Sequence, residues 1–207
     1  TWSPDGTMLA FLEAWEGIES LLIAPIKPDG YPAASPVKID LHQLTDYRLA
    51  GWGADDKIGL VFRSPEVTAL YTVPVSGGKA VQMTPKEGWM PSWTPDGKWI
   101  YFDGAHHGPQ ANIEFIAAAG GKVTRIPVRG PHPLQPNYPT GGISVSPDGK
   151  KILFQGHFYQ APAKWGPHIF TIPVEGGEVT EILTGITWSI QPCWSPDGKS
   201  IAFLGRE

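Results

Sequence analysis

Short apolar runs alternate with polar turns along the whole chain, and they follow one recurring order. In each repeat, a run rich in β-branched and aromatic residues ends in Phe, at Phe11, Phe62, Phe102, Phe154 and Phe203. The interval between these residues is 40 to 52 residues. Runs of this composition favour β-strands. A period of this length is typical of repeat architectures, so we expect each repeat to be one small all-β unit.

A polar turn, Ser/Thr-Pro-Asp-Gly or a close variant of it, precedes four of these runs. Pro presets the φ angle of the first corner, Asp can accept a hydrogen bond from the nearby backbone, and Gly adopts the left-handed conformation. The fifth copy, Trp52 to Asp56, has neither Pro nor Gly at the turn positions where the other copies carry them. Its Trp lies ten residues before Phe62, whereas the other copies have nine, so we expect a wider and less regular turn. The sequence predicts purely structural hairpin turns at Asp5, Gly6, Asp96, Gly97, Asp148, Gly149, Asp197 and Gly198.

Each repeat continues with two further runs, and a Gly pair stands between them. Together with the run that precedes the turn, this predicts four antiparallel strands, A to D. Such a unit cannot bury both of its faces, so the units must stack radially as the blades of a β-propeller. The predicted repeats span approximately 1–46, 47–86, 87–137, 138–185 and 186–207, the last one partial. We interpret the chain as a segment of a larger propeller, with a closed four-bladed ring as the alternative.

Composition narrows the class of protein. With 41% apolar residues, 25 Gly and 22 Pro, the chain is a turn-rich globular domain. Its net charge of −4 gives no indication of the positively charged surface that binds nucleic acid. No apolar stretch is long enough to span a membrane, so we expect no membrane insertion. Cys193 is the single cysteine, which rules out an intrachain disulfide. Beside Trp194 on an expected inner strand, it is predicted to be buried, and the repeat residues Trp2, Trp52, Trp93 and Trp194 are predicted to lie in the core.

The repeat resembles a known family. The unit Trp-Ser-Pro-Asp-Gly-Lys-x-Ile-Ala-Phe at residues 194–203, together with Ile-Pro-Val-x-Gly-Gly at 172–177, is similar to the repeats of TolB-like and WD40-like β-propellers. The same repeat also resembles the propellers that precede prolyl-oligopeptidase-type hydrolase domains, although the TolB-like repeat is the more similar one. The resemblance implies six to eight blades, docking of protein or peptide partners, and a periplasmic or secreted location. If the propeller is incomplete, self-association is also expected.

Strand order predicts where a site would lie. In an up-and-down blade, the A–B and C–D turns share one end, and the B–C and D–A loops share the other. Long loops that carry aromatic and His residues on a rigid scaffold are typical of binding surfaces. The candidate binding residues on this loop face are Trp15, His106, His107, His132, Tyr138, His157, Tyr159, Trp165 and His168. A solvated surface is the simpler interpretation of the His106–His107 pair.

Three functions fit the sequence. The first is a non-enzymatic scaffold that binds a protein or peptide through the loop face. The second is an accessory propeller that gates a serine hydrolase domain elsewhere in the parent chain. The third is a propeller lyase or lactonase whose His and carboxylate residues hold a metal. The sequence has no Gly-x-Ser-x-Gly nucleophile motif, no phosphate-binding loop and no Cys cluster, so we expect no cofactor and no catalytic residue in this segment.

Overall fold

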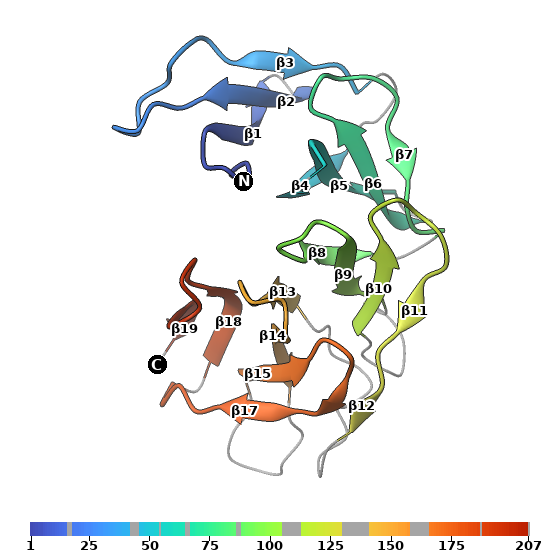
Figure 1. Cartoon of the computed structure of the whole chain (residues 1–207), viewed down its shortest axis with the longest axis vertical. Coiled ribbons are helices and arrows are strands. Elements are labelled where there is room, and N and C mark those ends of the chain that lie inside the picture. Colours follow the sequence, from blue (N-terminus) through green and yellow to red (C-terminus); the bar gives the residue numbers. More distant parts are fainter. Residues whose placement is uncertain are drawn as a thin grey trace. The chain divides into compact units, whose positions relative to one another are not determined.

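The computed structural model describes residues 1–15, 18–41, 46–53, 55–64, 67–85, 88–104, 113–129, 141–157, 166–186 and 188–206. For residues 14, 15, 18, 19, 141 and 157, it describes the backbone alone. The chain divides into two compact units, Thr1–Glu87 and Gly88–Glu207. All regular elements in the described ranges are strands (Figure 1). None of the described segments forms a helix of the length and apolarity needed to cross a membrane.

The first unit contains two antiparallel sheets. The first blade is the sheet β1-β2-β3, and the second blade is the sheet β4-β5-β6-β7. Trp2 bridges Leu9 on β1, which adds a short inner segment to the first blade. The strands are β1 (Met8–Trp15), β2 (Ile18–Pro25), β3 (Val37–Ile39), β4 (Tyr47–Trp52), β5 (Lys57–Arg63), β6 (Thr68–Pro74) and β7 (Val81–Gln82).

The second unit contains the third, fourth and fifth blades, which are the sheets β8-β9-β10-β11, β13-β14-β15-β17 and β18-β19. The predicted all-β fold with four-stranded antiparallel blades is therefore confirmed. The strands are β8 (Trp89–Trp93), β9 (Trp99–Asp103), β10 (Ile113–Ala117), β11 (Thr124–Arg125), β12 (Val128–Arg129), β13 (Gly141–Val145), β14 (Lys151–His157), β15 (Pro167–Pro173), β16 (Gly177–Glu178), β17 (Thr180–Ile182), β18 (Trp188–Trp194) and β19 (Ile201–Arg206).

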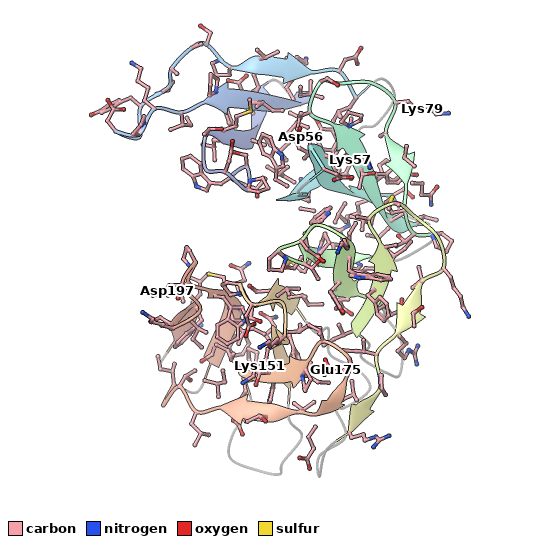
Figure 2. All side chains as sticks on the ribbon, in the orientation of Figure 1. Asp56, Lys57, Lys79, Lys151, Glu175 and Asp197 are labelled. Atoms are coloured by element: carbon pink, nitrogen blue, oxygen red, sulfur yellow. The ribbon has the colours of Figure 1, made fainter. Side chains whose placement is uncertain are left out.

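The four Ser/Thr-Pro-Asp-Gly turns share one hydrogen-bond pattern. In the fourth blade, the Ser146 hydroxyl donates to Asp148 at 2.6 Å and accepts from the N–H of Lys151 at 2.9 Å. Asp148 also accepts from the N–H of Lys150 at 3.0 Å, and Gly149 closes the turn with a φ of 70°. These donors hold the pKa of Asp148 below its usual value, the hydroxyl contributing most. The same hydroxyl-to-carboxylate bond, at 2.6 Å, occurs at Asp5, Asp96 and Asp197 (Figure 2 labels Asp197).

The turn of the second blade is shorter than its counterparts, and the expected wider turn is wrong. Trp52 pairs with Ile58 across five residues, whereas Trp93 pairs with Ile100 across six. Asp56, which adopts a φ of 53°, and Lys57 form the end of this turn (Figure 2). The added length lies in β5 instead, where Phe62 follows Ile58 by four residues, whereas Phe102 follows Ile100 by two. Leu60, which is fully buried, therefore takes the place that the sequence pattern assigned to Phe62.

Neighbouring blades within each unit bury apolar side chains between them. In the first unit, Ala10, Leu21 and Ile39 pack against Tyr47, Trp52 and Ile58 of the second blade. In the second unit, Tyr101 packs in one cluster with Ile143, Phe154 and Ile172 of the fourth blade. The Tyr101 hydroxyl also donates to the carbonyl of Val174 at 3.3 Å. Burial raises the pKa of Tyr101, and Glu175 adds a smaller effect (Figure 2 labels Glu175).

Hydrogen bonds join the inner strands of the second unit. The N–H of Val145 donates to Ser92 Oγ at 3.0 Å, and the N–H of Trp194 donates to Ser144 Oγ at 3.3 Å. Ser92 and Ser144 hold the same position in successive repeats, one residue before the repeat Trp or Val. We call these bonds the inner seam. They connect each inner strand to the next one without a shared β-ladder.

A second link joins the third and fourth blades near the C–D turn of the fourth. β12 pairs in parallel with β16, Val128 opposite Gly177 and Arg129 opposite Glu178. The N–H of Gly177 donates to the carbonyl of Pro127 at 2.8 Å, and the N–H of Val179 donates to that of Arg129 at 3.0 Å. Runs of two residues carry no periodicity, so the repeat pattern did not predict this link.

Two expectations about buried residues are wrong. Trp52 is buried, but Trp2 is 52% exposed and Cys193 is exposed as well. Both residues occupy repeat positions whose counterparts are covered by an adjacent blade. The repeat pattern specifies which face a residue is on, and burial then depends on whether another blade covers that face.

Candidate binding surface

Strand pairing places the B–C hairpins and the first residues of the inner strands at one end of each blade. In the second unit, Trp89 lies opposite Asp103, Gly141 opposite Gln155, and Trp188 opposite Arg206. This end is the predicted loop face. Asp103, the last residue of β9, is fully buried there.

Most of the predicted binding residues lie outside the described residues. This applies to His106, His107, His132, Tyr138, Tyr159 and Trp165. Trp15 is the last residue of β1, opposite Ile18, and His157 is the last residue of β14, opposite Pro167, both described by their backbone alone. Both therefore lie at strand ends on the loop face of their own units. The proposed roles of these eight residues remain predictions.

His168 is the predicted residue whose side chain the structure describes. Its Nδ1 lies 2.6 Å from Oε1 of Glu181 on the adjacent strand β17, and both side chains are partly buried. The imidazole ring also stacks on Phe170, with 6.5 Å between the ring centroids. These contacts fix the ring against its own sheet, so they give His168 a packing role in the fourth blade.

Three neighbouring inner strands are bulged close to this end. The pairing register shifts between Trp89 and Ser92 on β8, between Gly141 and Ser144 on β13, and between Ile190 and Cys193 on β18. A bulge adds one residue to a strand and re-aims the side chains around it. The left-handed residue in the three bulges is Met90 with φ 48°, Gly142 with φ 59° and Gln191 with φ 51°.

Close packing and a side-chain hydrogen bond hold these bulges in place. A Cβ atom on Gly142 would lie 2.7 Å from Cδ of Pro192 and 2.9 Å from Cα of Gln191, so only Gly fits between β13 and β18 here. The N–H of Gln191 donates to Oε1 of Gln155 at 2.8 Å. A non-Gly residue in this conformation costs about 1–2 kcal/mol, and surrounding contacts must offset that cost at Met90 and Gln191.

The result is a row of exposed and half-buried apolar and amide groups, which we call the bulge-row surface. It consists of Met90, Gly142, Gln155, Trp188 and Gln191. Met90 is 44% exposed and Trp188 is 45% exposed, although both belong to inner strands. Polarizable Met and amphipathic Trp side chains are frequent in protein recognition. Among the residues that the structure describes, no three or more His, Cys, Asp or Glu side chains group together as a metal site.

The candidate binding residues predicted from the sequence belong to this end of the blades, but the bulges were not predicted. The available signal was Pro at the residue after the left-handed position, as in Met90-Pro91 and Gln191-Pro192. Pro cannot donate to a ladder and is confined to edges and bulges in sheets. An inner strand that contains Pro is therefore a candidate for a bulge. Gly142-Ile143 in the fourth repeat lacks this signal.

Comparisons with known proteins define the class of fold. No protein-family model matches the chain. An uncharacterized protein of Agrobacterium fabrum is 26% identical over 219 residues, which cover 98% of this chain and 67% of that protein. TolB from Acinetobacter baumannii aligns with a TM-score of 0.73 and 22% identity, over 97% of this chain and 47% of that chain.

Two other solved structures share the architecture. The β-propeller domain of the Trilobed protease from Pyrococcus furiosus aligns with a TM-score of 0.64 and 20% identity, over 99% of this chain and 62% of that chain. A chain of the nidogen/laminin complex aligns with a TM-score of 0.66 and 12% identity, over 95% of this chain and 70% of that chain. The chain thus has the TolB-like β-propeller fold, and it spans about half the length of the Acinetobacter TolB chain.

Proposed function

We propose that this chain is a non-enzymatic propeller scaffold that binds a protein or peptide partner through its loop face, with the bulge-row surface as the central contact. The observation that carries the proposal is the exposure of Met90, Trp188 and Gln191 on inner strands that are bulged at equivalent positions. A rigid sheet that exposes apolar side chains next to amide groups can bury a peptide side chain and pair its backbone.

The likeness to TolB and to a chain of a protein–protein complex supports the general class of partner. It also supports an extracytoplasmic location, periplasmic or secreted, as part of the same proposal. We expect the loop residues of the same unit to add contacts beside the central contact; they are His106, His107, His132, Tyr138, His157, Tyr159 and Trp165. Trp15 belongs to the first unit, and its predicted binding role is a separate proposal for that unit. His168 would act indirectly, by positioning its own strand through Glu181.

Binding of selected peptides tests the proposal. Random linear peptides displayed on phage are selected on the immobilised chain, and the selected peptides are measured by fluorescence anisotropy. We expect Met90→Ala and Trp188→Ala to weaken their binding at least about tenfold, because truncation of a central aromatic or flexible apolar contact costs more than about 1.4 kcal/mol.

Tyr31→Ala provides the matched control, since Tyr31 is an exposed aromatic residue on the first unit. It should leave the affinity unchanged. The melting temperature of each variant shows whether the fold is intact. If no peptide is selected, or if selected peptides bind the Met90 and Trp188 variants as tightly as the unaltered chain, the bulge-row surface is not the binding site.

A second function is favoured by the likeness to the propeller domain of a protease. In this alternative, the chain is an accessory propeller that gates a serine hydrolase domain in the parent protein. A prolyl-oligopeptidase-type hydrolase domain, added in solution, should then bind the isolated chain. Binding should change the size range of the peptides that the hydrolase cleaves. If the hydrolase domain neither binds the chain nor changes the size of the peptides it cleaves, and if the phage selection does yield binding peptides, the scaffold function is favoured.

A further inference from the structure

One aromatic residue at the turn end of the third blade departs from the repeat. Trp99 is the first residue of β9, and it is 41% exposed. The second and fourth blades carry Lys57 and Lys151 at this position, and the fifth blade carries Ser200 (Figure 2 labels the two lysines). The fold of a blade therefore does not require an aromatic residue here.

A carboxylate in the C–D turn of the fourth blade is a second departure. Glu175 stands directly before the Gly pair of this turn and is exposed. The corresponding residues of the second and third blades are the uncharged Ser76 and Ala119. The first Gly of the pair closes the turn with the same backbone hydrogen bond in all three blades, at 2.8 to 2.9 Å. The turn therefore forms without this carboxylate.

Tyr101 connects the two departures within the second unit. Its side chain and that of Trp99 leave β9 on the same face, because residues two apart on a strand share a face. Phe115 contacts both rings at a centroid distance of 5.4 Å, edge-on to Trp99 and tilted against Tyr101. The Tyr101 hydroxyl donates to the carbonyl of Val174, the residue before Glu175. Trp99 and Glu175 thus border one junction between the third and fourth blades.

This junction has a negative electrostatic potential. Burial raises the pKa of Tyr101 most, and the carboxylates of Glu175 and Asp96 raise it further. Both carboxylates therefore lie close enough to act on the Tyr101 hydroxyl. Nζ of Lys98 lies 3.3 Å from Oδ2 of Asp96 and offsets part of that charge. Glu175 is consequently the main carboxylate available at the junction.

We propose that Trp99 and Glu175 form a binding site for an arginine side chain of a partner protein. The planar guanidinium group lies on the exposed part of the Trp99 indole and donates hydrogen bonds to the Glu175 carboxylate. Guanidinium groups combine these two contacts better than ammonium groups do. Phe115 already holds the indole in place, so little side-chain freedom is lost on binding. The site lies at the turn end of the blades, whereas the bulge-row surface lies at the loop end, so the two sites are independent.

An NMR titration with N-acetyl-argininamide tests this site. The indole N–H signal of Trp99 is followed at low ionic strength, and we expect it to shift progressively until the site is saturated. N-acetyl-citrullinamide has nearly the same shape but no charge, so it should leave the signal in place. A high concentration of NaCl should weaken the arginine binding, because salt screens the attraction to the carboxylates.

Two matched variants show whether Glu175 is the partner of the guanidinium group. Glu175→Gln should weaken the binding about three- to fivefold, as expected for a partly exposed ion pair. Glu178→Gln removes the same charge from the same turn, but Glu178 stands opposite Arg129 of β12 and does not contribute to the pKa shift of Tyr101. Glu178→Gln should therefore bind like the unaltered chain.

Trp99→Lys introduces the residue that the second and fourth blades carry, and it should abolish the arginine binding. Its melting temperature shows whether the blade is intact, and Glu175→Gln tests the site without altering a packed side chain. Trp188→Ala should leave the arginine binding unchanged, which separates this site from the bulge-row surface. An unmoved Trp99 signal, equal shifts with the citrulline compound, or equal effects of Glu175→Gln and Glu178→Gln would overturn the proposal.

Discussion

Replacing Gly176 with Ala tests the link between the third and fourth blades. Gly176 has a φ of 88°, in the left-handed region that residues with a Cβ avoid. An added Cβ would lie 2.3 Å from the carbonyl oxygen of Pro127 and 2.7 Å from its Cδ atom. Both contacts are with backbone or a proline ring, which cannot rotate away, so β12 and β16 must move apart.

The loss of unfolding free energy that we expect for Gly176→Ala has two parts. The left-handed conformation costs an Ala residue about 1–2 kcal/mol. Separation of β12 from β16 loses the hydrogen bonds from Gly177 to Pro127 and from Val179 to Arg129, each worth about 0.5–1.5 kcal/mol. Gly176→Ala should therefore lower the free energy of unfolding by about 2–5 kcal/mol.

Gly120 offers a matched control in the same unit. It occupies the same position of the third blade's C–D turn, with a φ of 92°, and a Cβ there would meet nothing within 4 Å. Gly120→Ala should therefore cost only the conformational part. Urea unfolding of the two variants, followed by tryptophan fluorescence, gives the difference directly. Equal losses of stability in the two variants would refute the role assigned to the β12–β16 link.

Two other predictions follow from the turns and from the unassigned histidines. The pKa of Asp148 is lowered from 3.8 in the folded chain, so its contribution to stability is complete above that value and is lost as the pH falls below it. Urea midpoints should therefore drop in acid, and Ser146→Ala should raise the pKa of Asp148 in an NMR titration. Added Zn²⁺ should leave the melting temperature unchanged; a rise would instead favour the metal-dependent lyase or lactonase.

The repeat turns made the architecture predictable, because their side chains form hydrogen bonds within the turn itself. The Ser146 hydroxyl, the Asp148 carboxylate and the left-handed Gly149 all act within six residues, so the motif alone specifies the hairpin. The β12–β16 link and the shorter turn after Trp52 could not be predicted in this way. The link depends on contacts between distant segments, and the turn depends on how the chain divides its residues between the turn and the strand that follows.

For the candidate site, the sequence predicted which end of the blades carries it, but not which side chains it exposes. Strand order places His157 and Trp89 at that end, and the pairings to Pro167 and Asp103 agree with this placement. The side chains that the surface exposes depend on the bulges at Met90 and Gln191. A bulge arises from how an inner strand fits its neighbours, which a single repeat sequence does not encode.

The inner seam has a consequence for how such chains evolve. A serine hydroxyl on one inner strand accepts from a backbone N–H on the next, as Ser92 does from Val145 and Ser144 from Trp194. Every residue except proline has this N–H, so the donor requires no particular side chain. A duplicated gene segment that encodes one blade would therefore already encode both the serine acceptor and the backbone N–H donor of an inner-seam hydrogen bond. Propellers built in this way can gain or lose blades in single genetic events, without first evolving a new interface.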